Sequence, residues 1–294
     1  MRLPKVECTA IIGVGLIGGS FGMALKKRGL ARKVVGVGRN PDKLRRAAEL
    51  CAIDAWTTDL DAVASEANLI YIATPVSMVL DFVRRAAPLA TSGCIITDAG
   101  STKAEICQGA SHLISSGISF IGGHPMAGSD VTGVEAGSPD LFVDAAYVLT
   151  PLENVDPEAL DLMHDLAEAI GARVIIMSPE AHDRCVAVIS HLPHLMAAAL
   201  LHLTSEQASV DPRIVELIAG SFRDMTRVAG SSPELWRDIC ISNSDSITQA
   251  VEGLCAKMGD AVRLMESGNR TDIEHWFKQA RDFRQSLFDK RSGE

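Results

Sequence analysis

The sequence predicts an α/β protein, with an N-terminal parallel sheet crossed by helices and a C-terminal part built only of helices. Short apolar runs alternate with helical patterns as far as Met177, and strand-like runs stop after it. In addition, a glycine-rich turn joins the first apolar run to the first helical pattern. We therefore expect two domains, residues 1–177 and residues 178–294.

The first domain is expected to contain alternating strands and crossover helices. Its strand-like runs are Cys8–Ile12, Val34–Val37, Leu69–Ala73, Cys94–Thr97, Ser119–Ile121, Tyr147–Thr150 and Arg173–Met177. Apolar residues at helical spacing mark Leu16–Arg28, Asp42–Leu50, Val76–Ala87 and Lys103–Ser115. Helices placed between strands in this way cross over a parallel sheet.

Helix start signals mark the second domain. Ser178 and Ser232 each precede a Pro-Glu pair, which places a capping hydroxyl before a proline at the first helical position. Thr271 and Glu274 have the spacing of a capping box. Pro193 lies inside a helical pattern and is expected to distort that helix locally.

Composition excludes several classes of protein. The chain has 294 residues, of which 47% are hydrophobic and 22% charged, as in a soluble globular protein. Its net charge of -9 argues against a nucleic-acid binder. Seven scattered cysteines without a CxxC pair indicate neither a disulfide framework nor a zinc ribbon, so a reducing cytoplasm is expected. The uncharged stretch Ala10–Leu25 is too rich in glycine for a signal or membrane helix, and we expect no membrane segment.

The glycine motif Gly13-Val14-Gly15-Leu16-Ile17-Gly18 follows a predicted strand and opens a predicted helix. In such a motif the first glycine permits the tight turn, the second lets a pyrophosphate approach the backbone, and the third lets helix and strand pack closely. Phosphate then meets the positive end of the helix. We expect Gly13, Gly15, Leu16, Ile17 and Gly18 to bind a dinucleotide in a Rossmann-type domain; the alternative is a glycine-rich turn without a ligand.

The end of the second predicted strand bears on the choice between NAD and NADP. Val37-Gly38-Arg39-Asn40 lacks the acidic residue that binds the ribose 2′-hydroxyl of NAD. Arg39 suits a 2′-phosphate instead, with Lys43 as possible support, so NADP is mildly favoured. The alternative is that Arg39 is a solvated surface charge and the protein accepts NAD.

Two later strand ends are expected to face the cofactor, because open α/β sheets bind ligands at the carboxyl ends of their strands. Thr74 and Pro75 follow one strand, and Ser101 follows another. Ser101 can donate to a histidine or to the nicotinamide amide, although a serine before a helix is often only an N-cap. His124 lies in a turn of small residues, Gly122–Ser129. It is a candidate base, because neutral imidazole has suitable basicity near pH 7; otherwise it is a hydrogen-bonded turn histidine.

Taken together, the motifs resemble those of the prephenate and arogenate dehydrogenase family of tyrosine biosynthesis. The resemblance covers nearly the whole chain and is carried by Gly13–Ser20, Asp98–Lys103, Gly122–Ser129, the run Ser190-His191-Leu192-Pro193-His194, the run Phe222-Arg223-Asp224-Met225-Thr226-Arg227, and Trp236-Arg237-Asp238. It implies a Rossmann-type domain, an all-helical domain that forms a homodimer, and NAD or NADP as cofactor. No chorismate mutase or ACT regulatory domain is expected within this chain.

The resemblance also implies roles for single residues. His124 takes the proton of the substrate's ring hydroxyl, and Ser101 orients His124 and touches the nicotinamide. Arg227 holds the ring carboxylate, while the other candidates for substrate binding are His194, Ser129, Gly220 and Trp236. The substrate is prephenate, arogenate or both, and Asp130 is a candidate acidic group beside the amine of arogenate. Competitive inhibition by L-tyrosine is expected, because tyrosine resembles the aromatic product.

Alternatives remain for several of these residues. His191 and His194 have a spacing that lets two side chains touch one metal, but no third ligand is evident and we expect no metal site. His191 is then the better candidate for a core histidine. Arg227 has helical spacing to Asp224 and can form a surface ion pair with it. Alternative functions are a β-hydroxyacid dehydrogenase, which relies on a catalytic lysine, and a non-catalytic NADP-binding redox sensor.

Overall fold

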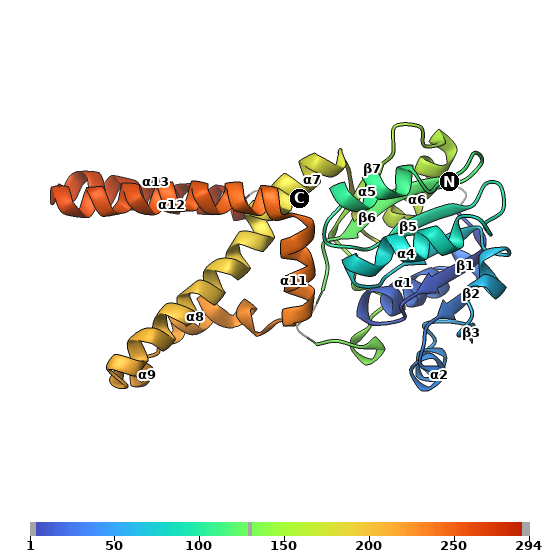
Figure 1. Ribbon diagram of the computed structural model, residues 1–294, viewed down its shortest axis with the longest axis horizontal. Helices are drawn as coiled ribbons and strands as arrows, with labels where there is room; N and C mark the ends of the chain where they lie inside the picture. The colour runs from blue at the N-terminus through green and yellow to red at the C-terminus, as the bar shows by residue number, and fades with distance from the viewer. Residues whose placement is uncertain (1–3, 129–130, 290–294) are drawn as a thin grey trace. The chain divides into compact units, whose positions relative to one another are not determined.

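The computed structural model describes residues 4–128 and 131–289. Contacts divide the chain into two compact units, Met1–Ser246 and Ile247–Glu294. The first unit holds a sheet with helices on both faces (Figure 1). It also holds several of the helices that follow the sheet. The expected boundary near residue 177 stays a prediction.

The sheet has eight strands in the order β3-β2-β1-β4-β5-β6-β7-β8. The strands are β1 Val6–Ile12, β2 Ala31–Val37, β3 Ala55–Thr57, β4 Leu69–Ile72, β5 Ile95–Asp98, β6 Ser119–Pro125, β7 Ala146–Pro151 and β8 Arg173–Ile176. All seven predicted strands are present. The edge strand β3 was not predicted, because three residues are too short to display an alternating pattern.

The sheet is parallel, as expected, except at one pairing. β7 pairs with β6 in the antiparallel sense, whereas all other neighbours are parallel. Among its described residues, the connection from β6 to β7 contains one helical element, the 3₁₀ turn Val134–Ala136. A parallel strand needs a crossover to return to the starting edge, usually by a helix, and an antiparallel strand does not.

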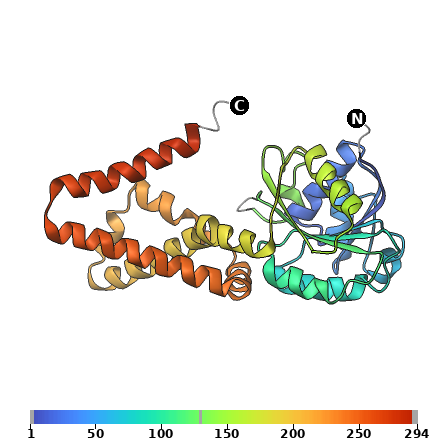
Figure 2. The same cartoon turned by 90° about the horizontal axis from the view of Figure 1, so that it is seen from above.

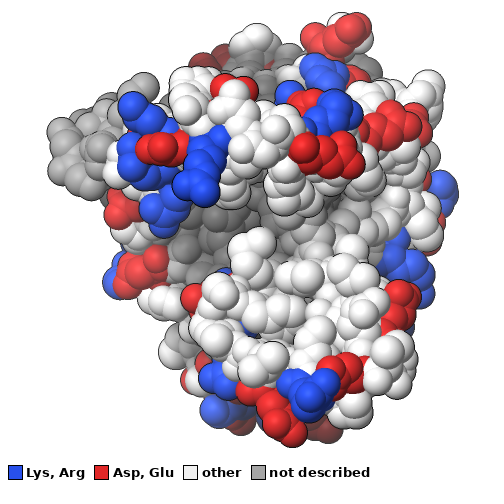
Figure 3. Space-filling view, turned by 90° about the vertical axis from the view of Figure 1, so that its left-hand side faces the viewer, with Lys and Arg blue, Asp and Glu red and all other residues white. Residues whose placement is uncertain are grey.

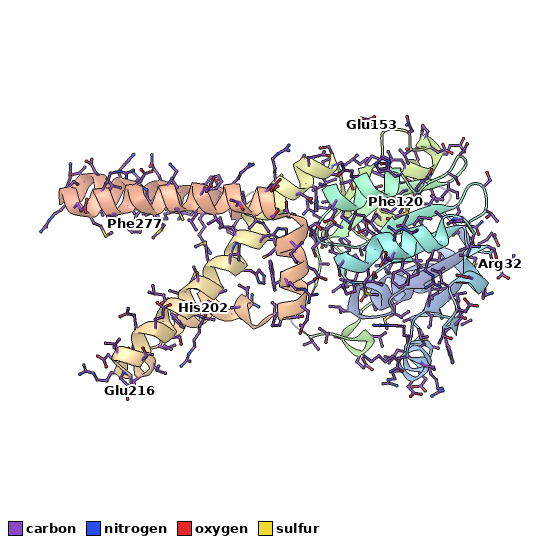
Figure 4. All side chains as sticks on the ribbon, viewed as in Figure 1. Arg32, Phe120, Glu153, His202, Glu216 and Phe277 are labelled. Atoms are coloured by element: carbon purple, nitrogen blue, oxygen red, sulfur yellow. The ribbon has the colours of Figure 1, made fainter. Side chains whose placement is uncertain are left out.

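Helices cover the sheet on both faces. On one face α1 (Leu16–Lys27), α2 (Pro41–Glu49) and α6 (Pro157–Ala169) contribute to an apolar cluster in which the rings of Phe21 and Tyr71 stack at 3.9 Å. On the other face α3 (Asp61–Ala64), α4 (Val76–Ala86) and α5 (Ala104–Ser111) pack with Phe120 of β6 (Figure 4). This double covering explains why the strands read as continuous apolar runs.

After β8 the first unit continues as helices. They are α7 Pro179–Val186, a π-helical segment Ala187–His191, α8 Leu192–Val210, α9 Arg213–Glu216, α10 Gly220–Thr226, the 3₁₀ turn η3 Arg227–Gly230 and α11 Pro233–Ser242. The two predicted serine caps are confirmed: Ser178 Oγ accepts from the Ala181 N–H at 3.2 Å, and Ser232 Oγ accepts from the Leu235 N–H at 3.3 Å. The π segment directly before α8 is the distortion expected from Pro193, which lacks an N–H to donate.

The second unit consists of the greater part of α12 (Ser244–Ser267) and α13 (Arg270–Asp289). The two helices meet at a short turn and diverge from it (Figure 2). The predicted capping box is wrong, because Asn269 Oδ1 caps α13 by accepting from the N–H groups of Thr271 at 3.1 Å and Asp272 at 3.4 Å. Asn269 lies two residues before Thr271 and takes the Thr271 N–H, to which the side chain of Glu274 would bind in a capping box.

Large apolar side chains are exposed on helices of both units. Met258, Val262 and Met265 repeat at helical spacing along α12, and Phe277 and Phe283 are exposed on α13. The face in Figure 3 has a broad uncharged centre with Lys, Arg, Asp and Glu at its margins. Exposed large apolar side chains that cluster in this way are typical of a surface that contacts another protein.

The continuous helical stretch Pro179–Val210 passes a length and composition test for a membrane span. Only 22% of its most apolar window is buried within the chain, and Val188, Ile189 and Leu203 are exposed. The test is weak evidence for a membrane, because an apolar helix that packs against protein passes it as well.

Candidate active site

The turn between β1 and α1 has the backbone geometry that a dinucleotide site requires. Gly13 has φ = +91°, and a Cβ there would lie 2.5 Å from the carbonyl oxygen of Ala73. A Cβ on Gly18 would lie 2.2 Å from the Gly13 oxygen. These two positions therefore accept only glycine. A Cβ on Gly15, in contrast, would meet nothing within 4 Å, so open space lies above the turn.

This open space adjoins the N-terminus of α1. Leu16 and Ile17 form the first turn, which contains no acidic residue, and Gly15 offers no side chain to cap it. The first N–H groups of the helix therefore point out of it without intrahelical partners and carry the positive end of its dipole. Thr74 lies beside the turn, with its Cγ2 3.1 Å from the Cβ position of Gly13, and Pro75 is the N-cap residue of α4. These residues fit the pyrophosphate of a dinucleotide.

Two alanine substitutions distinguish the structural glycine from the binding glycine. We expect Gly13→Ala to lower the free energy of unfolding by more than about 1 kcal/mol, because alanine strains at positive φ. Gly15→Ala should leave the free energy of unfolding nearly unchanged and weaken dinucleotide binding about tenfold or more, since its methyl group occupies ligand space. Urea unfolding and cofactor titration by fluorescence measure the two effects, and equal effects of both variants on unfolding would contradict this assignment.

The end of β2 presents a basic side chain. Arg39 is exposed, and no hydrogen bond or ion pair joins it to another described residue. Its neighbour Asn40 caps α2 by accepting from the N–H groups of Asp42 and Lys43 at 3.0 and 3.1 Å. Asp42 binds Arg45 at 2.8 Å. The guanidinium of Arg39 is thus available to a ligand at the ribose end of the turn.

His124 lies buried in β6, at the carboxyl edge of the sheet where the strands before it also end. The preceding residue, Gly123, donates its N–H to Asp98 Oδ1 at 3.2 Å, and a Cβ on Gly123 would lie 2.5 Å from the backbone carbonyl oxygen of Asp98. Glycine therefore lets β6 lie close to the end of β5. The Nδ1 of His124 lies 2.7 Å from the Nε2 of His182 on α7, and its Nε2 has no hydrogen bond to a described residue.

His182 is held in turn by the residue that follows it. Its Nδ1 lies 2.7 Å from Asp183 Oδ1. Asp183 accepts two further hydrogen bonds at 2.8 Å, from the backbone N–H groups of Lys103 and Ala104 where α5 begins. His182 and Asp183 were not predicted as site residues. The sequence offers only an adjacent His-Asp pair that begins four residues after Ser178, and its proximity to His124 arises from the tertiary fold.

The surroundings of His124 favour its neutral form. Burial lowers its pKa well below the ordinary 6.5, and the nearby His182, Lys103 and His191 lower it further. A buried imidazole with a lowered pKa is neutral at pH 7 and can accept a proton. His124 therefore has the protonation state of a general base.

A buried ion pair fixes the turn that carries Ser101. Lys103 Nζ binds Asp98 Oδ2, and both side chains have 0% exposure. Asp98 Oδ2 also accepts from the Gly100 N–H at 2.8 Å. Ser101 is half-buried and has no hydrogen bond to a described residue. The structure forms no hydrogen bond between Ser101 and His124; the Nδ1 of His124 is bound to His182 instead.

Three ring side chains, His191, His194 and Trp236, contact one another on the helices after β8. The rings of His194 (α8) and Trp236 (α11) stack at 3.8 Å, and His191 meets Trp236 edge-on at 5.9 Å. His191 is buried and lies 3.3 Å from the amide of Asn243; burial lowers its pKa to about 4, which is the behaviour of a core histidine. Trp236 Nε1 is buried without a hydrogen-bond partner among residues 4–128 and 131–289, so it can donate to a ligand.

Side-chain contacts join α11 to the loops that follow β4 and β5. Ser77 Oγ at the start of α4 donates to Asp238 Oδ2 at 2.5 Å, and Arg237 binds the other oxygen of Asp238. The Thr102 and Ser242 hydroxyls lie 2.9 Å apart. The helix that carries Trp236 is therefore fixed to the sheet edge that carries Thr74, Pro75 and Ser101.

The remaining predicted residues lie on neighbouring helices or outside the described part. Gly220 begins α10, where a Cβ would meet nothing within 4 Å, and Arg227 begins η3; both elements pack against α8. Ser129 and Asp130 lie outside the described residues. Within the described ranges, one group of three potential metal ligands occurs, His164, Asp165 and Glu168 on α6, and none belongs to the site above.

The fold and the site define a class of protein: a dinucleotide-dependent oxidoreductase with a Rossmann-type sheet and an attached helical part. The sequence profile of the prephenate dehydrogenase nucleotide-binding domain matches residues 21–176, and that of the prephenate dehydrogenase dimerization domain matches residues 178–279. The chain belongs to the prephenate dehydrogenase family.

Individual relatives agree with this assignment. The chain is 36% identical to prephenate dehydrogenase of Bacillus subtilis over 94% of its own length and 75% of that protein. It is 33% identical to cyclohexadienyl dehydrogenase of Zymomonas mobilis over 95% of both chains. A crystal structure of prephenate dehydrogenase from A. aeolicus, in complex with hydroxyphenyl propionate and NAD+, superimposes with a TM-score of 0.91 at 28% identity, over 97% of this chain and 100% of that one.

Proposed function

We propose that this protein catalyses the NAD(P)-dependent oxidative decarboxylation of prephenate to 4-hydroxyphenylpyruvate, a step of tyrosine biosynthesis in the cytoplasm. The observation that carries the proposal is His124. It is buried, neutral and bound at Nδ1, and it lies at the same edge of the sheet as the glycine turn after β1. The Bacillus subtilis relative, which is 36% identical to this chain, is named prephenate dehydrogenase.

In the proposed reaction His124 acts as the proton acceptor. A bound nicotinamide supplies the hydride acceptor for the ring carbon that carries the hydroxyl. The Nε2 of His124 accepts the proton of that hydroxyl, which lowers the barrier because the oxygen becomes a carbonyl. The bond to the ring carboxylate then breaks and carbon dioxide leaves. The electrons of that bond complete the aromatic ring, and the carbonyl oxygen becomes a phenol oxygen that takes the proton back from His124. Ser101 would contact the nicotinamide amide.

The substrate carries two carboxylates, which the helical residues are proposed to bind. Arg227 would bind the ring carboxylate through a forked contact, since guanidinium pairs with carboxylate in a bidentate way. His194 and the Nε1 donor of Trp236 would contact other polar atoms of the substrate. Gly220 leaves room at the start of α10, and Ser129 is a further candidate contact.

Arogenate is the alternative substrate, and the similarity to a cyclohexadienyl dehydrogenase favours acceptance of both. Product analysis tests the proposal. Prephenate should yield 4-hydroxyphenylpyruvate, carbon dioxide and reduced nicotinamide in equal amounts. Reduced nicotinamide without carbon dioxide would indicate a simple alcohol dehydrogenase instead.

We propose that the functional form is a soluble homodimer. The exposed apolar side chains of α8, α12 and α13 would be covered by a second copy, in agreement with the match of residues 178–279 to a dimerization domain. Such a contact also accounts for the apolar stretch Pro179–Val210 without a membrane.

We propose that the cofactor is NADP in preference to NAD, on the basis of Arg39. We expect Arg39→Ala to weaken NADP binding about 10- to 100-fold, because the variant loses a charge-assisted hydrogen bond to the 2′-phosphate. NAD has no 2′-phosphate, so its binding should change little. The matched control is Arg45→Ala, which removes an exposed arginine of the neighbouring helix that is paired with Asp42. Titration with both cofactors measures the effect, and equal loss for NAD and NADP would contradict the assignment.

L-Tyrosine is proposed to inhibit by competition with the substrate, because it resembles the aromatic product. The apparent KM for prephenate should rise with tyrosine concentration while kcat stays constant. Initial rates at several tyrosine concentrations measure this, and a kcat that falls at saturating prephenate would exclude simple competition.

A further inference from the structure

Three buried side chains, Asp183, His182 and His124, form a hydrogen-bonded series, and the Nε2 of His124 is the nitrogen at its open end. The series runs from Asp183 Oδ1 to His182 Nδ1 (2.7 Å), and from His182 Nε2 to His124 Nδ1 (2.7 Å). His182 and Asp183 have side-chain exposures of 1% and 3%. Water therefore has little access to the two inner hydrogen bonds, so their polarity is set by the protein.

The donors and acceptors of the series follow from Asp183. An ionised carboxylate only accepts, and Asp183 already accepts from two backbone N–H groups at the start of α5. The Nδ1 of His182 must therefore carry a proton and donate it. In a neutral His182 the other nitrogen, Nε2, carries a lone pair and accepts. The Nδ1 of a neutral His124 then donates, and its Nε2 is left with the lone pair.

We propose that Asp183 and His182 are positioning residues that fix His124 in the Nδ1–H tautomer, so that Nε2 is the proton-accepting nitrogen. The inference rests on the proposed function for its kinetic consequence alone, because the tautomer itself is a property of the protein without substrate. The same logic holds for other buried Asp–His pairs, in which an aspartate selects the histidine tautomer that can act as a base.

Other charged and titratable groups face this series from the packed elements. Lys103 and Asp98 neutralise each other at the end of β5, and His191 lies on the π-helical segment. The opposite polarity requires a cationic His182 that donates from Nε2 to His124 Nδ1. The Nε2 of His124 would then carry the proton and could not accept one. The two arrangements thus predict different tautomers at His124.

The first test is direct measurement of the tautomer. The full-length protein labelled with ¹⁵N-histidine has eight histidines, and the spectrum of His124→Asn identifies the signals of His124 by their loss. Long-range ¹H–¹⁵N correlation at pH 7.5 should show a protonated Nδ1 and an unprotonated Nε2 for His124. A protonated Nε2 in the wild-type protein would overturn the proposal, whatever the activity of the enzyme.

Variants extend the test to the origin of the tautomer. His182→Leu removes the acceptor and should give His124 a mixture of tautomers, whereas His182→Gln places an amide oxygen near the position of Nε2 and should retain the Nδ1–H form. The control Asn243→Ala removes a hydrogen bond to the Asp183 carbonyl (2.9 Å) and leaves the series intact, so the tautomer should not change. An unchanged Nδ1–H tautomer in folded His182→Leu would overturn the role of His182.

Kinetics then separate positioning from binding. We expect His182→Leu and Asp183→Asn to lower kcat about 100-fold or more, because the base is misprotonated, with KM values changed by less than about threefold. His182→Gln should stay within about tenfold of wild type. An increase in KM with unchanged kcat would contradict the positioning role. Failure of the wild-type enzyme to oxidise prephenate, with the Nδ1–H tautomer present, would refute the proposed function and leave this inference standing.

Discussion

Replacement of His124 by asparagine is expected to lower kcat by about three orders of magnitude, within the range for loss of a general base. Asparagine can still donate to His182 from the position of Nδ1 but has no nitrogen at the position of Nε2. Binding should survive, because the pyrophosphate turn and the proposed carboxylate ligand lie on other elements. Steady-state rates of reduced nicotinamide formation give kcat and KM for this variant.

The pH dependence of the wild-type enzyme provides a second measure of the same role. The base must be neutral to act, and the pKa of His124 is lowered well below 6.5 by burial and by its neighbours. Activity should therefore be level near neutral pH and fall only as the pH drops through that lowered pKa. Unchanged kcat in His124→Asn, with cofactor affinity and thermal stability like wild type, would remove His124 from the chemistry.

Replacement of Lys103 by methionine is expected to lower the free energy of unfolding by about 3–5 kcal/mol, because it leaves the buried carboxylate of Asp98 without its counter-charge. Asp98 also holds the N–H groups of Gly100 and Gly123, so its protonation or displacement would disturb the residues beside Ser101 and His124. Urea unfolding followed by circular dichroism, at one fixed protein concentration, measures the loss.

The matched control is Arg84→Met, which removes an ion pair with Asp81 at the surface, where both side chains are more than half exposed. Exposed pairs of this kind contribute about 1 kcal/mol or less. A loss for Lys103→Met as small as that of the control would mean that the buried Asp98 carboxyl does not need the charge of Lys103, which would contradict this account.

Local sequence patterns were sufficient for the fold and for the dinucleotide turn. Each strand except β3 is long enough to read as an apolar run. A side chain at Gly13 is excluded by the carbonyl oxygen of Ala73, directly after β4, and one at Gly18 by the carbonyl oxygen of Gly13. The antiparallel direction of β7 could not be read in this way. It depends on how the connection Met126–Ala145 is routed, and the apolar pattern of a buried strand is the same in both directions.

The site was predictable only in part. Ser101 follows the end of β5, which is a local signal, whereas His124 was expected in a turn and lies in β6, one residue before that strand ends. The hydrogen bond of His124 to His182 joins residues 58 positions apart, and the two bonds from α5 to Asp183 join residues about 80 apart. The sequence around His182 contains no pattern that predicts its contact with His124. The sequence therefore indicated a base, while its orientation by α7 is a tertiary property.

The central claim is that this chain oxidises and decarboxylates prephenate through a nicotinamide cofactor. The most direct test measures initial rates of reduced nicotinamide formation for the purified protein, with prephenate and L-arogenate each combined with NAD and NADP. We predict turnover of prephenate, faster with NADP than with NAD, and its dependence on His124. No turnover in any of the four combinations, by a folded dimer that binds the cofactor, would contradict the proposed function.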